Sequence, residues 1–136
     1  MTQEEKMLLI KDLSARLPYA VTVEHTSGFR GTLHNITIHH KYDEQDNVYD
    51  AICYTDFFGD EDSIYIEYFK PLLFPLSSMT EEQKEELVHI VLMCGTLASS
   101  QLTHMTVDDW FNKNHLDHRG LIPIDLAIDA TGKNIY

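Results

Sequence analysis

Signatures of known catalytic chemistry are missing from this sequence. It contains no GxSxG or SxxK element that would carry a serine nucleophile, and it contains no CxxC pair. No GxGxxG or GxxxxGK[ST] loop follows a predicted strand, so nothing supports a phosphate-binding loop. These absences favour a protein that is not an enzyme, and we expect it to bind no cofactor.

Cysteines and long apolar runs are also few. The two cysteines, Cys53 and Cys94, lie far apart in the sequence, and we expect both to be buried thiols in a reducing cytoplasm. No run approaches the ~20 apolar residues that a membrane-spanning helix needs. Residues 1–13 place acids before their apolar part and contain no small-residue cleavage site, so they do not have the pattern of a signal peptide. We therefore expect a cytoplasmic protein.

Positive charge is scarce. The chain has 10 Lys and Arg against 22 Asp and Glu, which gives a net charge of −12 at pH 7. The imbalance is greatest over residues 42–69, which hold nine acids and no Lys or Arg. Such a charge repels nucleic acids and anionic lipid surfaces, so we expect neither direct nucleic-acid binding nor membrane association. The partner that the composition favours is another protein, and the sequence leaves the oligomeric state open.

The pattern that is present is that of a single α+β domain of 136 residues, beginning with a helix. Thr2 and Glu5 form a capping box, which predicts a helix over 3–17 that ends at Pro18. Its apolar stripe is expected to face the core and its charged side to face solvent. The stripe comprises Leu9, Ile10, Leu13 and Leu17, and the charged side comprises Lys6, Lys11 and Asp12.

A period of two replaces the helical pattern over 19–69. Four short alternating segments separated by turns predict a four-stranded antiparallel meander, with strands near 19–24, 33–40, 48–55 and 64–69. The meander could remain an open sheet or close into a small SH3-like barrel. The proline-interrupted segment 71–76, PLLFPL, is expected to be an extended strap over the core.

The most apolar helix is expected over 81–95, where Thr80 and Gln83 form a second capping box. Its second half, from Leu87 to Cys94, is apolar almost all round, which is typical of a buried helix. We therefore expect this helix to be central, with the meander packed against it. A short helix over 107–114 and an extended tail over 119–136 complete the predicted domain.

Two histidines near the short helix are candidate metal ligands. His115 and His118 lie three residues apart, a spacing that brings both imidazoles to one side of a helical turn. A closed zinc site needs four ligands, however, and no Cys-rich motif accompanies the pair. We therefore expect surface histidines near a helix C-terminus, favoured there by the helix dipole, and no metal site.

The remaining candidates form a possible interaction surface. The acidic turn DFFGDED could bind a cation weakly, but it lacks the EF-hand order of ligands, so a solvated hairpin tip is favoured. Trp and Arg are residue types that anchor interfaces. The favoured alternative is that Trp110 fills the core with Phe111, while Arg119 pairs with an aspartate near it, Asp117 or Asp108. The candidate surface comprises Asp56, Asp60, Glu61, Asp62, Trp110 and Arg119.

Three stretches of the chain carry a resemblance. MTQEEK with KDLSARLPY (1–19), PLSSMTEE (75–82) and DWFNKNHLDHRGLI (109–122) resemble a group of short uncharacterised proteins of gut Bacteroidales bacteria and their phage-like mobile elements. The resemblance covers roughly a third of the chain and leaves out the strand region. It implies a bacterial, cytoplasmic setting and a phage-borne origin. The group has an aromatic residue where this chain has His118, which argues against a chemical role for that imidazole.

Three hypotheses about function follow. The first is a small acidic, non-enzymatic protein-interaction module of a bacterial mobile element or phage, which binds through the sheet edge, the acidic turns or the C-terminal segment. The second is an acidic nucleic-acid mimic that inhibits a host DNA-binding protein. The third is a metal-dependent enzyme whose His and Asp ligands are scattered along the chain. The first is favoured, because catalytic signatures are missing and the acids are unevenly distributed.

Overall fold

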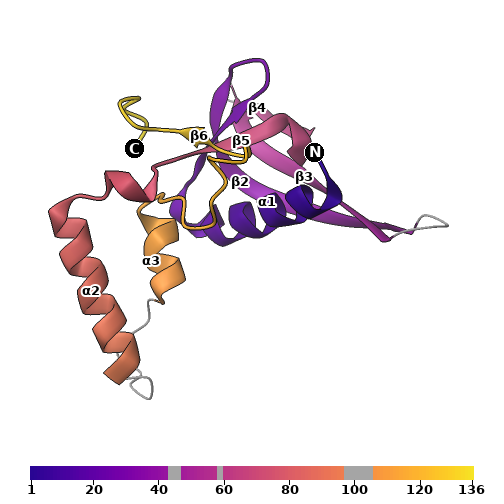
Figure 1. Ribbon diagram of the computed structural model, residues 1–136. Coiled ribbons are helices and arrows are strands. Elements are labelled where there is room, and N and C mark those ends of the chain that lie inside the picture. The colour runs from indigo at the N-terminus through magenta and orange to yellow at the C-terminus, as the bar shows by residue number, and fades with distance from the viewer. Residues whose placement is uncertain (43–46, 58–59, 97–105) are drawn as a thin grey trace.

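In the part of the chain that the structure describes, three α-helices lie beside a mixed, open β-sheet, so the predicted α+β fold class is confirmed (Figure 1). The structure is a computed structural model that describes residues 1–42, 47–57, 60–96 and 106–136, with side chains over 1–39, 50–55, 65–92 and 106–136. The helices are α1 (Gln3–Arg16), α2 (Glu81–Thr96) and α3 (Val107–Lys113). The strands are β1 (Thr22–His25), β2 (Arg30–Tyr42), β3 (Asn47–Phe57), β4 (Asp60–Tyr65), β5 (Phe69–Leu73) and β6 (Ile128–Asp129). Three short 3-10 helices connect them: η1 (Leu17–Tyr19), η2 (Ile66–Tyr68) and η3 (Leu76–Ser78).

The sheet only partly matches the predicted meander. Its order is β4-β3-β2-β1-β5-β6, and β1 to β4 do pair antiparallel with their neighbours in sequence. The predicted fourth strand over 64–69 is divided, because η2 turns the chain after β4 and sends β5 to the other side of β1. The two-residue strand β6 then pairs parallel with β5. The sheet is therefore open and mixed, and it has more strands than we expected.

The segment predicted to be a strap lies partly within the sheet. Pro71 belongs to β5 and stands opposite Val23 of β1, so the expectation that its prolines keep 71–76 out of regular structure was wrong over Pro71–Leu73. Beyond this pair, the Tyr136 hydroxyl accepts a hydrogen bond from the Thr22 backbone N–H (2.9 Å) and donates one to the Leu72 carbonyl (2.8 Å). The tyrosine thereby joins β1 and β5 where their pairing ends.

A register shift in β2 changes which residues face the core. The pairing of β2 with β3 is irregular between Leu33 and Asn35, as in a β-bulge. An extra residue at this point reverses the alternation, so Leu33 is buried and Ile36 packs against the same core. Strict alternation would place these two side chains on opposite faces of the strand.

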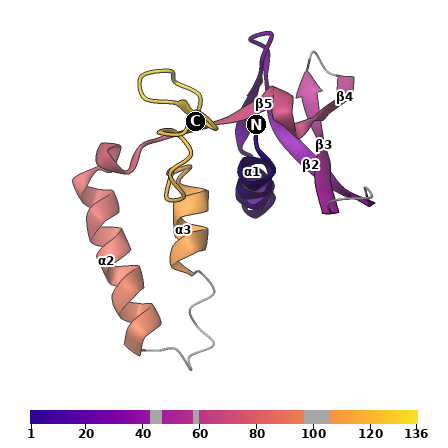
Figure 2. The same ribbon diagram turned by 45° about the vertical axis from the view of Figure 1, so that its right-hand side comes forward.

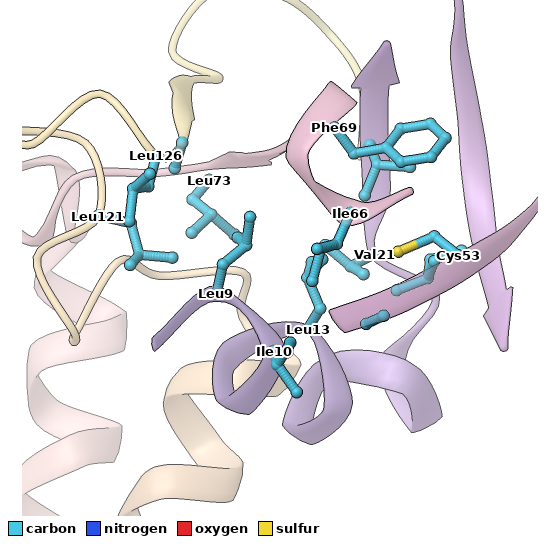
Figure 3. Packing of buried hydrophobic residues seen from close by; sticks show 14 residues of the cluster. Leu9, Ile10, Leu13, Val21, Cys53, Ile66, Phe69, Leu73, Leu121 and Leu126 are labelled. Atoms are coloured by element: carbon cyan, nitrogen blue, oxygen red, sulfur yellow. The ribbon is translucent and has the colours of Figure 1, made fainter. Parts of the chain in front are cut away.

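The helix that completes the core is α1. Leu9, Ile10 and Leu13 point from it toward the sheet and are at most 4% exposed (Figure 3). They pack against side chains of the sheet, of η2 and of the C-terminal tail, so the prediction that these three residues of the stripe face the core is confirmed. The partners shown in Figure 3 include Val21, Cys53, Ile66, Phe69, Leu73, Leu121 and Leu126. The tail is thus more than a surface segment, because Leu121 and Leu126 are part of the core.

The prediction that the helix over 81–95 is central and buried was wrong. The helix forms as α2, but Val88, Val91 and Leu92 are between 49% and 61% exposed. Figures 1 and 2 show the reason: α3 lies between α2 and α1, so α2 is the outermost layer and the sheet is two layers away. Within the described ranges, none of the helices combines the length and apolar character needed to cross a membrane.

Candidate interaction surface

Helix α2 is fixed at its start and held along one side. The Thr80 hydroxyl accepts the backbone N–H of Gln83 (3.1 Å), and the Gln83 amide oxygen accepts the backbone N–H of Thr80 (3.0 Å), so the predicted capping box is present. Farther along, the Trp110 indole N–H of α3 donates to a Glu86 carboxylate oxygen at 2.9 Å. Leu87 and Ile90 are half-buried. One side of α2 therefore rests on α3.

The opposite side of α2 presents apolar side chains to solvent. Val88 is 59% exposed, Val91 49% and Leu92 61%, and we call these three residues the outer patch. Positions i, i+3 and i+4 of a helix are neighbours on its surface, so the three side chains are contiguous. Scattered exposed apolar residues are ordinary, but a contiguous group on one helix face is typical of a site where another molecule packs.

Acidic residues precede the outer patch along the helix. Glu81, Glu82 and Glu85 are exposed in the first turns of α2. Lys84 pairs with Glu81 at 3.3 Å, and both side chains are more than half exposed, so this pair is weak and screened by water. The outer side of α2 thus changes from acidic to apolar along its length.

Trp110 lies in the interior, which is where the favoured interpretation placed it. It is fully buried, and its ring meets that of Phe111 edge-on with centroids 5.5 Å apart. The indole N–H is already used by Glu86. Trp110 therefore serves the packing of α3 and does not offer an anchor at the surface.

Arg119 also has an internal role, but with a different partner from those we expected. Its Nη1 lies 2.7 Å from Oδ1 of Asp12 and 3.1 Å from Oδ1 of Asn112, rather than pairing with Asp117 or Asp108. The other Asp12 oxygen accepts from Nε of Arg16 at 2.9 Å. Asp12 is fully buried, so its predicted place on the outer face of α1 was wrong.

The same network ties α1 to the loop after α3. Arg16 is fully buried, and its Nη2 donates to the Leu116 carbonyl at 2.7 Å. Asp117 accepts the backbone N–H groups of Leu121 (2.8 Å) and Ile122 (2.9 Å), which fixes the turn that follows. Sequence reasoning missed this cluster. Its signal was the i, i+4 pair of Asp12 and Arg16, whose opposite charges can meet on one helix face.

His115 and His118 stack on aromatic rings, so the prediction that they are surface histidines was wrong. The ring centroids of His115 and Tyr136 are 3.6 Å apart, and those of His118 and Phe111 are 4.9 Å apart. Burial, together with the nearby Arg16 guanidinium, lowers the pKa of His115 to about 4. Burial, and then the charge of Arg119, also lowers the pKa of His118. Both rings are therefore neutral at pH 7. Among the residues that the structure describes, no group of three or more His, Cys, Asp or Glu is placed to hold a metal ion.

Two pockets among the described residues are lined in part by polar groups that are already paired within the chain. One, of ≈ 310 Å³, lies between the β1–β2 turn and β5. Two of its charged groups are already paired, Glu24 with Arg30 and Lys70 with Asp125, each at 2.8 Å. The other, of ≈ 280 Å³, borders Thr80 and Gln83, which bind each other in the capping box.

The predicted acidic surface and the cysteines can be placed only in part. Asp56 lies on β3 and the segment 60–62 on β4, with Asp56 opposite Glu61 in the register, so these acids lie on paired strands. Their side chains, and that of Cys94, lie outside the described residues. Cys53 is fully buried, and burial raises the pKa of its thiol to about 12, so it is protonated at neutral pH.

Comparisons of the chain with models of known protein families, with curated proteins and with solved structures find no match.

Proposed function

We propose that this chain is a small acidic, non-enzymatic protein-interaction module that binds a partner protein through the outer patch of α2. The observation that carries the proposal is the exposure of Val88, Val91 and Leu92 on a helix whose other side rests on α3. The core is completed by α1, so the apolar second half of α2 is not required to cover the sheet. An apolar face that the fold does not use for its own core is available to a second molecule.

The charge of the chain supports a protein partner with positive charge beside its apolar surface. The net charge of −12 repels the anionic surface of a bacterial membrane, which would otherwise be a natural occupant of an apolar helix face. Glu81, Glu82 and Glu85 add negative charge beside the patch itself. A basic protein surface is attracted by the same charge, and this attraction speeds its association with the module.

A site-specific crosslink tests the proposal. A photo-crosslinking amino acid is placed at Val88 in purified protein, and the matched control carries it at Ile124, which is 47% exposed on the tail. Both proteins are mixed with a lysate of a gut Bacteroidales bacterium, the setting that the sequence resemblance implies. We expect a discrete adduct from position 88 that is absent from position 124 and is reduced by Val91→Ser. Equal adducts at both positions, or none at position 88, would contradict the proposal.

A second candidate is the acidic nucleic-acid mimic, and the register of one hairpin favours it. Asp56 and the segment 60–62 lie on adjacent strands, β3 and β4, which concentrates acids at one end of the sheet. Charge reversal of Asp60, Glu61 and Asp62 to Lys would abolish capture of a DNA-binding protein by such a mimic. If the crosslinked adduct at position 88 is unchanged in this triple variant, the mimic hypothesis fails and the α2 surface remains.

A further inference from the structure

We infer that the occupant of the outer patch is a cationic amphipathic helix, whose apolar side chains pack on Val88 and Val91 while its Lys or Arg side chains face Glu81 and Glu85. This inference rests on the proposed function, because it names the chemistry of the partner that binds the same surface. It goes further in specifying the secondary structure, the sign of the charge and the spacing of the partner's residues.

The spacing of residues on α2 sets the geometry. Glu81, Glu85 and Val88 follow one another at i, i+4 and i+7, so they lie along a single line on the outer side of the helix. With a rise of 1.5 Å per residue, Val88 lies ~10 Å along the axis from Glu81 and ~5 Å from Glu85. A second helix packed along this line matches it when its cations lie one to two turns from its apolar residues. A second helix can pack against α2 along the length of its axis, which favours a helical partner over a loop.

A second copy of this chain fits the line poorly. If two α2 helices packed in parallel, Glu81 and Glu85 would face the same glutamates of the other copy. If they packed antiparallel along their full length, Glu85 would lie opposite Leu92 of the other copy and would lose its water without gaining a partner. Each copy also brings a net charge of −12. A cationic helix avoids all three costs, because its charge is opposite and its apolar residues can be placed in either direction.

The size of the surface predicts a modest affinity. The outer patch has three exposed apolar side chains, whereas a stable interface covers roughly 800 Å² on each partner. We therefore expect a transient complex with a dissociation constant on the order of 10 µM and a marked dependence on salt.

Binding of synthetic peptides, measured by fluorescence anisotropy, tests the inference. The probe is a helix-forming peptide of about 20 residues with leucines along one face and lysines one to two turns away. A matched probe carries Glu in place of every Lys, and a second carries Ser in place of every Leu. We expect the Lys probe alone to bind the wild-type protein, and to bind the double variant Val88→Ser, Val91→Ser at least tenfold more weakly.

Matched protein variants separate the surface from general charge attraction. Glu81→Gln with Glu85→Gln is expected to weaken the Lys probe several-fold at low salt and to have little effect at ~0.5 M salt. Glu67→Gln, an exposed acid on η2, and Ile124→Ser on the tail should each change binding by less than twofold. The inference would be overturned if the Lys probe bound the double variant Val88→Ser, Val91→Ser as tightly as the wild-type protein. It would also be overturned if the Glu probe bound as tightly as the Lys probe.

Two further results separate this inference from the proposed function. If the protein forms a dimer in sedimentation analysis that Val88→Ser disrupts, the occupant is a second copy and the cationic helix is wrong. If position 88 crosslinks to a partner that the Lys probe fails to displace, the interaction module stands while its partner has another chemistry. If neither crosslinking nor the probe engages position 88, both proposals fail together.

Discussion

Helices α1 and α2 show how little apolar composition alone decides burial. They have 14 and 16 residues, and a threonine capping box begins each of them. α2 has the longer apolar run, yet Val88 is 59% exposed, whereas Leu13 of α1 is fully buried. The buried side of α1 even includes a charged pair, Asp12 with Arg16. Position in the fold therefore decides: α1 lies directly on the sheet, and α2 lies outside α3 (Figure 2).

The buried charges of α1 give the largest expected effect. Asp12→Ala removes the carboxylate that accepts from both Arg16 and Arg119, and it leaves a buried guanidinium without its counter-charge. Breaking such a pair by removing one member costs about 3–5 kcal/mol of the free energy of unfolding. Urea unfolding followed by circular dichroism measures the loss.

A surface ion pair provides the control for this variant. Asp125 pairs with Lys70 at 2.8 Å, but its side chain is 88% exposed, and asparagine tolerates the positive φ of 63° at this position, so Asp125→Asn should cost no more than about 1 kcal/mol. Equal losses for Asp12→Ala and Asp125→Asn would show that the internal network does not hold α1 in place.

A direct comparison of the two helices gives the next largest difference. Leu13→Ala opens a cavity in the core and is expected to cost about 2–5 kcal/mol. Val88→Ala removes atoms that are largely in water and is expected to change stability by no more than about 0.5 kcal/mol. Thermal and urea unfolding of both variants check the contrast. A cost above ~1.5 kcal/mol for Val88→Ala would mean that the outer patch is covered in the folded protein.

Local rules explain which parts of this fold could be predicted from the sequence. The capping boxes of α1 and α2 place their starts correctly, because a cap depends on residues three positions apart. The apolar stripe of α1 identifies Leu9 and Leu13 as core residues for the same reason. The antiparallel pairing of β1 to β4 follows from short turns between alternating segments.

The features that sequence reasoning missed depend on distant parts of the chain. Asp12 has an ordinary place for a surface acid, and one of its two internal partners, Arg119, lies 107 residues away in the sequence. The exposure of α2 depends on which helix packs against the sheet, and the apolar periodicity of a helix does not contain that information. Pro71 lies within β5 opposite Val23, and the neighbouring backbone groups of the two strands are joined by Tyr136, which lies far along the chain. Sequence reasoning missed the outer patch for the same reason, because it assigned the apolar second half of α2 to the core.

Acid is expected to weaken the region that joins α1 to the loop after α3. The pKa of His115 is lowered from 6.5 to about 4, so between these values the folded state binds fewer protons than the unfolded state. Stability therefore falls as the pH drops from 6.5 toward 4, by up to about 3 kcal/mol, and the contribution of His115 to the pH dependence fades above ~7.5. Urea midpoints measured across this range give the slope.

A variant at the same position isolates the contribution of His115. His115→Asn removes the titrating ring, and asparagine tolerates the positive φ of 56° at this position. We expect the variant to show a shallower pH slope between 4 and 6.5, with a residual slope from His118 and the carboxyl groups. An unchanged slope would assign the acid sensitivity to other groups.

The capping threonines give the smallest effects, and these effects test whether α2 unfolds with the core. Thr2→Ala and Thr80→Ala each remove one hydroxyl cap, worth about 1 kcal/mol to the helix that it begins. Because α1 is part of the core, Thr2→Ala should lower the global unfolding midpoint. Because α2 is the outermost layer, Thr80→Ala should instead speed hydrogen exchange in the first turns of α2 and leave the global midpoint almost unchanged. Equal shifts of the midpoint would show that α2 belongs to the same cooperative unit as α1, and its outer face would then be presented on a surface as rigid as the core itself.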